Sequence, residues 1–187
     1  MLIDAPGPVD LARTLGPFRT GGSDPSLRIT PSSVWRASRT PDGPATVQIV
    51  ASDALDGRLA SRFAVRAWGP GAAWAEAHAG DLLGFQDDPD AFAPGDELVQ
   101  RLHHRNPGLR FGRSWCVVEG LVPTILGQKV TTIEAQRSWR ALCRAHGAAA
   151  PGPAGAEGLR LRPDPVRLAE LRYSDFHRFG VERRRAE

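Results

Sequence analysis

The fold of this chain is decided by residues 115–147, which read WCVVEGLVPTILGQKVTTIEAQRSWRALCRAHG. In the first half, apolar residues recur at helical spacing and predict one buried helix face, formed by Trp115, Val118, Val122, Ile125 and Leu126. In the second half, the same spacing predicts an inner face formed by Ile133, Ala135, Trp139, Leu142 and Cys143. We therefore expect two apolar helices joined by a very short polar turn.

Local signals set the bends and ends of these helices. Pro123 removes a backbone donor and crowds the carbonyl of Glu119, so we expect a kink in the first helix. Thr131 and Glu134 match the capping box that opens a helix. Gly147 is placed to end the second helix.

The residues before this pair predict strands. The turn Thr40-Pro41-Asp42-Gly43 separates two strand segments and so predicts a hairpin. The expected elements are an edge strand or irregular lead-in at 9–15, strands at 27–38, 45–51 and 58–68, and a helix at 72–83. Pro31 places the first of these strands at an edge or inserts a bulge. The fold class is therefore α+β, with a small antiparallel sheet and a covering helix.

A domain boundary is expected at residues 84–95, which contain three Asp and two Pro. It divides the chain into an α+β domain at 1–86 and an all-α domain at 87–187. The second domain is predicted to contain short helices at 96–104, 165–171 and 175–180, and a flexible or partly extended linker at 148–158. A further helix begins at 182–185 without a closing signal, so we expect this domain to be incomplete.

The composition is typical of a soluble globular protein, and we expect a cytoplasmic location. No apolar run approaches the roughly 20 residues of a membrane helix, and the first residues do not form a secretory signal. Cys116 and Cys143 fall on predicted buried faces; two free core thiols are favoured, and a disulfide between neighbouring helices is the alternative.

Charge is distributed unevenly along the chain. Residues 1–98 carry eight Arg and 13 acidic residues, a net charge of −5. Residues 99–187 carry 15 Arg and one Lys against eight acidic residues, a net charge of +8. This asymmetry fits a basic half that meets a polyanion, or the solvated surface of an Arg-rich protein.

The familiar catalytic and cofactor motifs are missing from the sequence, so we expect no bound cofactor. No metal site is expected either. His103 and His104 are adjacent and would diverge on a helix, and the acidic run Asp87, Asp88 and Asp90 lacks the distal Glu of a calcium loop.

The polar turn is the best candidate site. Gln128 offers donors and an acceptor, Lys129 follows it, and Thr131 and Thr132 lie at the start of the next helix. A helix N-terminus beside a Lys suits a backbone phosphate. The alternative is an ordinary capped helix with a surface Lys.

Residues 107–147, and above all Ile125-Leu126-Gly127-Gln128 followed by Val130-Thr131, resemble bacterial 3-methyladenine DNA glycosylase II. The segments WRASRTPDG, AWGPGAAW and YSDFHRFGVERRRA extend the resemblance over nearly the whole chain. This family belongs to the helix-hairpin-helix superfamily of DNA glycosylases. The resemblance implies a first domain like half of a TATA-binding protein, followed by a helical bundle.

The resemblance also implies a function in base excision repair: a damaged, alkylated purine is extruded from double-stranded DNA and its glycosidic bond is hydrolysed. It places Gln128 and Phe18 at the base pocket, and Lys129, Thr131 and Thr132 at the DNA. Lys129 departs from the family, because the residue that fills the emptied stack is usually apolar. We expect a monomer.

The family's hairpin and catalytic Asp lie downstream of Glu187, so the resemblance assigns no catalytic residue within this chain. The isolated chain is accordingly expected to be the N-terminal part of such an enzyme and to lack glycosylase activity. Two alternatives stay open: a non-catalytic DNA-binding or regulatory protein, and an inactive gene fragment.

Overall fold

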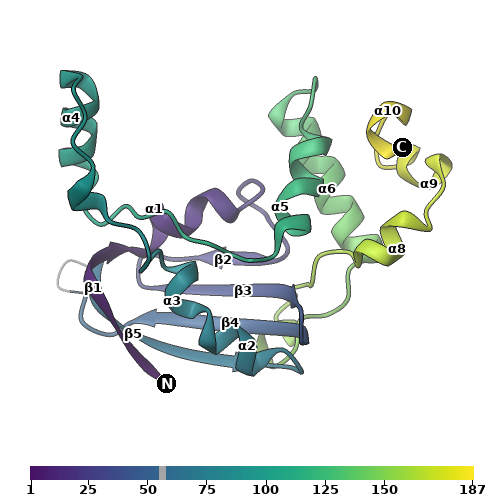
Figure 1. Cartoon of the computed structure of the whole chain (residues 1–187). Helices are drawn as coiled ribbons and strands as arrows, with labels where there is room; N and C mark the ends of the chain where they lie inside the picture. The colour runs from purple at the N-terminus through teal and green to yellow at the C-terminus, as the bar shows by residue number, and fades with distance from the viewer. Residues whose placement is uncertain (55–57) are drawn as a thin grey trace.

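The computed structural model describes residues 1–54 and 58–187 and has an α+β fold (Figure 1). One antiparallel sheet forms the base of the molecule, with its strands in the order β1-β5-β4-β3-β2. The strands of the described residues are β1 (Leu2–Asp10), β2 (Leu27–Ile29), β3 (Ser33–Thr40), β4 (Gly43–Ala51) and β5 (Leu59–Trp68).

Helices cover the sheet and then continue into a separate helical part (Figure 1). Those next to the sheet are α1 (Leu11–Leu15), the short 3₁₀ helix η1 (Gly16–Phe18), α2 (Ala72–Ala77) and α3 (Ala79–Leu82). The connection holds the 3₁₀ helix η2 (Pro89–Ala91) and α4 (Glu97–Arg105). The helical part consists of α5 (Val117–Leu126), α6 (Thr132–His146), α7 (Pro153–Ala156), α8 (Pro165–Ala169), α9 (Tyr173–His177) and α10 (Arg183–Ala186).

The predicted hairpin is confirmed as β3 and β4. Thr40 pairs with Gly43 across the turn, and the Thr40 hydroxyl donates to the Gly43 carbonyl at 2.7 Å. Gly43 has φ +115°, a conformation that side chains rarely adopt. The alternation of β4 turns Val47 and Ile49 to the core, as the period of two requires.

The sheet has more strands than the sequence predicted. The expected strand at 27–38 is divided into β2 and β3, and Pro31 lies between them. Residues 9–15 were expected to be a strand or a lead-in, but only their start belongs to a strand. Strand β1 ends at Asp10, and α1 follows it because the Asp10 carboxylate accepts from the N–H of Arg13 at 3.0 Å.

Most of β1 was missed because it contains Pro6, Gly7 and Pro8. The pairing of β1 with β5 shifts between Asp4 and Val9, which places these residues at an irregularity of an edge strand. Proline is tolerated at such a position because no ladder hydrogen bond is needed there.

The main core lies between the sheet and the helices that cover it. Its buried side chains come from the five strands, from α1, and from α3 and the residue after it: Val9, Leu11, Leu15, Leu27, Val34, Val47, Ile49, Ala60, Phe63, Val65, Ala79, Leu82 and Leu83. The helix expected at 72–83 is present in two pieces, α2 and α3, which meet at His78. The rings of Trp74 and His78 are stacked with their centroids 4.0 Å apart, so aromatic packing stabilises the point where the two helices meet.

The segment 148–158 was expected to be a flexible or partly extended linker; it is extended at Ala149, but it is ordered and packed. It contains α7, and Ala149 bridges Arg160 in antiparallel fashion. Ala150 and Ala154 pack with Leu159 and Leu161 against Ala37 of β3. The small side chains of this segment allow it to pack closely on the sheet. A composition rich in Ala, Gly and Pro does not distinguish such a packed segment from a linker.

The two central helices are confirmed, including the capping box of α6 and its end at Gly147. Their cluster contains Leu126, Trp139, Leu142 and Cys143, together with Phe176 and Val181 from the α9 region. Three residues predicted to be buried are exposed instead: Trp115 (53%), Val118 (43%) and Ile133 (79%). The periodicity predicted both helices correctly, but packing within the described residues leaves these three side chains exposed.

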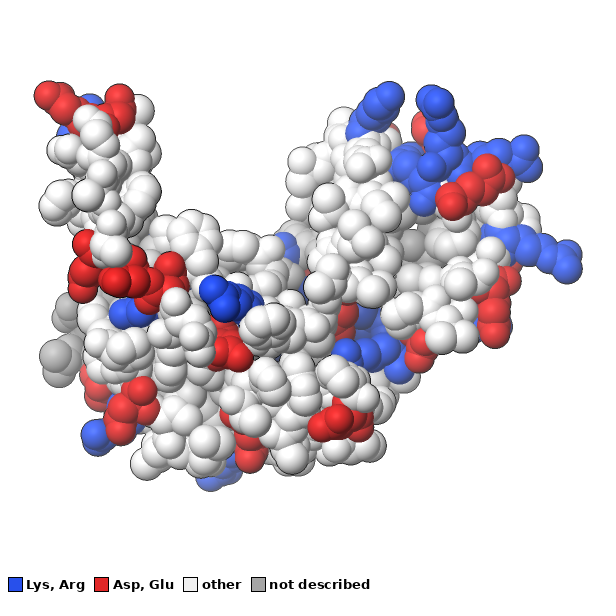
Figure 2. Space-filling view, viewed as in Figure 1, with Lys and Arg blue, Asp and Glu red and all other residues white. Residues whose placement is uncertain are grey.

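Helix α4 stands away from the rest of the molecule, and Figure 2 shows the surface hollowed between it and the helical part. Its N-terminus is capped by the Asp96 carboxylate, which accepts from the N–H groups of Leu98 and Val99. None of its residues is buried. Lys and Arg side chains gather over the helical part at the right of Figure 2, whereas acidic groups mark α4 and its base.

Candidate functional site

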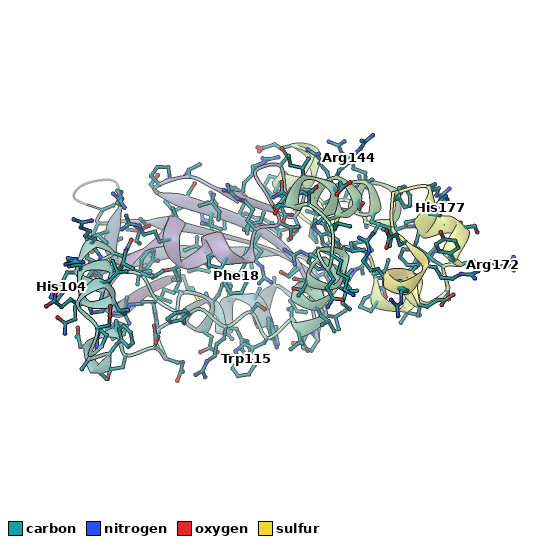
Figure 3. The ribbon with its side chains drawn as sticks, turned by 90° about the horizontal axis from the view of Figure 1, so that it is seen from above. Phe18, His104, Trp115, Arg144, Arg172 and His177 are labelled. Atoms are coloured by element: carbon teal, nitrogen blue, oxygen red, sulfur yellow. The ribbon has the colours of Figure 1, made fainter. Side chains whose placement is uncertain are left out.

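A cavity of about 500 Å³ lies where the sheet part meets the helical part. Its walls come from η1 and the following loop, from β3, and from the facing sides of α5 and α6; they include Phe18, Arg36, Glu119, Gly127 and Thr132. Figure 3 shows Phe18 near the middle of the molecule, between the α4 end, marked by His104, and the helical end.

Phe18 is held in this wall by its backbone and by its ring. Its carbonyl accepts from Nη2 of Arg162 at 2.9 Å, and Cζ of Arg36 lies 5.5 Å from the ring centroid. The loop behind it approaches α6 so closely that a Cβ at Gly21 would overlap the side chain of Gln136. The structure therefore places Phe18 in the cavity wall; its role in binding a base stays a prediction.

The floor of the cavity contains a buried ion pair that the sequence did not reveal. Nη2 of Arg36 lies 2.9 Å from Oε2 of Glu119, and both side chains are more than nine-tenths buried. The other carboxylate oxygen accepts from the N–H of Arg39 at 2.8 Å. This pair ties β3 to α5 and fixes the orientation of both walls.

Arg162 is a third member of this contact between the sheet part and α5, and Pro123 provides one of the acceptors that it uses. Proline has no N–H to donate to the carbonyl four residues earlier, so the Glu119 carbonyl lacks its helical partner. Nη1 of Arg162 donates to that carbonyl instead. The same guanidinium donates to Ser26 Oγ at 2.9 Å and lies 3.6 Å from the buried carboxylate of Asp24.

The predicted turn lies at the rim of the cavity. Gln128 and Lys129 are exposed, and Lys129 adopts φ +55°, which is uncommon for a residue other than glycine. Such conformations occur often at functional sites because surrounding contacts must hold them. Gly127 and Thr132 line the cavity on either side of this turn, together with Phe18. Gln128, Lys129 and Thr131 are not part of the cavity lining, so their roles stay predictions.

The side chain of Thr131 is used in the capping box of α6. Its hydroxyl accepts from the N–H of Glu134 at 3.3 Å, and the Glu134 carboxylate accepts from both the hydroxyl and the N–H of Thr131. These hydrogen bonds from Thr131 lower the pKa of Glu134 below its usual range. Thr131 therefore shapes the turn, and Thr132 is the freer of the two for contact with a ligand.

The cysteines are free and buried, as favoured from the sequence. Cys116 lies in the cavity wall, but burial and the nearby Glu119 raise the pKa of its thiol. Burial likewise raises the pKa of Cys143. Neither group is poised as a thiolate nucleophile.

The described residues contain no group of three or more His, Cys, Asp or Glu side chains arranged to hold a metal ion. None of the helices in this part of the chain combines the length and apolar character needed to cross a bilayer.

Sequence reasoning missed Arg36, Glu119 and Arg162, although each is more than nine-tenths buried. A weak signal existed: Glu119 lies on an otherwise apolar helix, four residues before the proline. Its partners lie 83 and 43 residues away in the chain, so no local pattern could pair them.

No protein-family model matches the sequence, and no curated protein matches it either. The fold is similar to that of the 3-methyladenine DNA-glycosylase from Archaeoglobus fulgidus, with a TM-score of 0.76, 17% identity, and coverage of 100% of this chain and 63% of that one.

Two other DNA glycosylases share the fold. MBOgg1, solved with a low-affinity DNA ligand, matches with a TM-score of 0.67 and 12% identity over 99% of this chain and 58% of that one. The 8-oxoguanine glycosylase/lyase of Clostridium acetobutylicum, solved with double-stranded DNA containing cytosine opposite 8-oxoG, matches with a TM-score of 0.58 and 10% identity over 100% and 61%. This chain thus spans about three-fifths of the length of each neighbour, and it has the α+β fold of the matched parts of these DNA glycosylases.

Proposed function

We propose that this chain is the DNA-binding part of a DNA N-glycosylase that acts in base excision repair. One observation carries the proposal: a cavity of about 500 Å³ opens directly beside an exposed turn that protrudes between two helices. An enzyme of this class must take a nucleotide out of the base stack and hold its base in a pocket. A protruding turn can take the place of the extruded nucleotide, and the cavity beside it can hold the base. The fold shared with DNA glycosylases supports the same function.

The turn would enter the minor groove. The methylene stem of Lys129 occupies the space left by the extruded nucleotide, and its ammonium group meets a phosphate. The N-terminus of α6, with Thr132, binds the backbone beside it. Gln128 lies toward the base, and Phe18 stacks on it inside the cavity.

The partner is double-stranded DNA with a damaged purine, bound by a monomer. The sequence resemblance implies alkylated purines, and the names of the structural neighbours include both 3-methyladenine and 8-oxoguanine. Glu119 and Asp24 are paired with guanidinium groups, so we assign them a structural role and not the chemistry of bond cleavage.

The test is to measure the binding of double-stranded DNA by the full chain at several salt concentrations, with fluorescence anisotropy as the readout. Lys129→Leu is expected to lower the salt slope of log Kd by about one, because one phosphate contact is lost, while base extrusion is preserved or improved. Arg62→Leu is the matched control, because Arg62 lies on β5 and is paired with Asp4.

Gln128→Ala is expected to reduce the preference for a damaged duplex, and turnover where turnover is measured, with non-specific affinity nearly unchanged. If this turn is only a capped helix junction, both variants bind like the parent chain. Unchanged salt slope and unchanged preference would therefore refute the proposal.

A further inference from the structure

Arg185 of α10 contacts the end of α5, directly before the exposed turn. We infer that Arg185 is a positioning residue: it fixes the last carbonyl of α5 and thereby the shape of the turn at residues 127–131. The side chain of Arg185 is only 8% exposed, so it acts through the turn and not by contact with DNA. This role rests on the proposed function, because this is the turn that is proposed to enter the minor groove.

The contact satisfies a carbonyl group that the helix itself leaves free. Nη1 of Arg185 donates to the carbonyl of Leu126, the last residue of α5, at 2.9 Å. The last four carbonyl groups of a helix have no N–H partner within that helix. The N–H groups of Gly127 and Gln128 donate to carbonyls earlier in α5, so among the described residues only Arg185 donates to the Leu126 carbonyl. The helix dipole also favours a cation at this end of a helix.

Arg185 is held in place mainly by the packing of its neighbours. Ala186 follows it in the chain and packs against the hydrophobic cluster that contains Leu126 and Val181. Nη2 of Arg185 also lies 3.8 Å from the carboxylate of Glu182, but that side chain is 76% exposed. Such an exposed ion pair contributes little. The orientation of Arg185 toward α5 is therefore set by burial in the helical part.

Stability alone does not favour an arginine at this position. Nε of Arg185 is buried and has no hydrogen-bond partner among the described residues. A buried guanidinium with an unused donor destabilises a fold compared with a well-packed apolar side chain of similar volume. The benefit of the guanidinium therefore lies in the group that it orients, the Leu126 carbonyl.

The turn needs to be held because one of its residues has an uncommon conformation. Lys129 has φ +55°, which is unfavourable for a residue other than glycine and persists when surrounding contacts fix the chain. After it, the capping box of Thr131 and Glu134 fixes the chain. Before it, the hydrogen bond from Arg185 to Leu126 does the same. These two contacts bracket the turn.

The charge of Arg185 also reaches the second of these contacts. Hydrogen bonds from Thr131 and, to a smaller extent, the charge of Arg185 lower the pKa of Glu134. The guanidinium is thus close enough to the capping box to affect its carboxylate. One buried side chain therefore acts on both ends of the turn.

The shape of the turn and the charge of the surface affect DNA binding in different ways. Non-specific affinity depends on exposed cations that meet phosphates. Extrusion of a base requires a turn that keeps its shape inside the duplex, and a turn ordered before binding loses less entropy on entry. Removal of Arg185 should therefore impair extrusion and leave non-specific affinity nearly unchanged.

The test uses the full chain and a duplex with one 2-aminopurine opposite cytosine, whose fluorescence rises when the base leaves the stack. We expect Arg185→Met to lower the ratio of extruded to stacked base at saturating protein about tenfold, because a charged hydrogen bond is lost. Anisotropy with an unmodified duplex should show nearly the parent affinity. Arg185→Lys keeps a cationic donor and should keep most of the extrusion.

Arg184→Met is the matched control, because Arg184 is the exposed neighbour on the same helix. It removes one positive charge and should leave the extruded fraction unchanged. If Arg184→Met and Arg185→Met reduce extrusion equally, the loss of charge is the cause and the role of Arg185 in positioning is refuted.

A rescue variant tests whether Arg185 acts through the end of α5. Gly127→Ala favours the helical conformation there. The added Cβ would lie 3.4 Å from the Pro123 carbonyl oxygen and 4.0 Å from Cβ of Ala135, which are ordinary contacts. We expect Gly127→Ala to raise extrusion about threefold to fivefold more in the Arg185→Met background than in the parent chain. An equal effect in both backgrounds would mean that Arg185 does not act on this turn.

The failure of this role and the failure of the proposed function give different results. A fluorescence rise in the parent chain that Arg185→Met leaves unchanged overturns the role of Arg185 alone. If the parent chain gives no rise at saturation, both the proposed function and the role of Arg185 are overturned. Should Arg185→Met fail to fold, Arg185→Gln, which is shorter and uncharged, is measured in its place and carries the same expectation.

Discussion

The sheet part and the helical part of this molecule reach order by different routes. In the sheet part, buried side chains from every strand and from α1 and α3 form one core, with Phe63, Val34 and Ile49 fully buried. In the helical part, a smaller cluster lies around Trp139, and large apolar residues of the same helices stay exposed, among them Val117 (77%). A helix forms from residues close together in the chain, whereas covering its apolar face requires residues from elsewhere.

Because of this difference, we expect the sheet part to be the more independent folding unit. Hydrogen exchange should show stronger protection in β4 and β5 than in α6. Stronger protection of residues 132–146 than of the strands would reverse the comparison.

The largest expected effect is the loss of the joint between the two parts. Arg162→Met removes the partner of Asp24 and the donor to the Glu119 carbonyl, which leaves buried polar groups unpaired. We expect the free energy of unfolding to fall by about 3–5 kcal/mol, measured by chemical denaturation. Arg28→Met is the control: its pair with Glu157 is exposed, and the expected loss is about 0–1 kcal/mol. Equal losses would show that the buried network does not hold the parts together.

Matched core truncations compare the two clusters directly. Leu15 in the sheet core and Leu142 in the helical cluster are both fully buried leucines on helices. Leu→Ala is expected to cost about 2–5 kcal/mol at each. We expect the loss for Leu15→Ala to be near the upper end of this range, because its surroundings are closed. The loss for Leu142→Ala should be near the lower end, because its less covered neighbours can move into the space that the truncated side chain leaves. A larger loss at Leu142 would contradict the comparison.

A smaller effect is expected at the start of α6. Thr131→Ala removes the hydroxyl that accepts from the Glu134 N–H, at a cost of about 1 kcal/mol. Thr132→Ala, one position later, leaves the capping box intact and should cost clearly less. The pKa of Glu134 is lowered in the folded chain, so the stability from this box is present above the usual Glu pKa and is lost as the pH falls through the lowered one. In Thr131→Ala that acid-dependent loss should shrink.

The smallest expected effect is a pH dependence near neutrality. Burial, and then the charges of Arg178 and Arg167, lower the pKa of His146 at the end of α6. The unfolded chain therefore takes up the proton first as the pH falls, and the helical part loses stability between about pH 7 and the lowered pKa. His146→Gln should flatten the dependence of unfolding free energy on pH in this range, and His104→Gln on exposed α4 should not. A flat profile in the parent chain would contradict the assignment.

Residues close together in the chain were predicted well. The hairpin turn at Gly43, the alternation of β4, the capping box at Thr131 and the end of α6 at Gly147 are all confirmed. Each depends on backbone geometry or hydrogen bonds within a few residues, which the sequence encodes directly. The domain boundary near residue 86 and the roles of Gln128, Lys129 and Phe18 stay predictions.

The sequence by itself therefore determined the α+β class, the helix pair and the turn between its helices, because periodicity and capping act over one or two turns of chain. Only the tertiary structure decided that Arg36, Glu119 and Arg162 meet at one cavity floor, that residues 148–158 pack on the sheet, and that Ile133 is exposed. The physical reason is the range of the forces: a buried charge chooses its partner by three-dimensional proximity, and a helix face is buried only if another element reaches it.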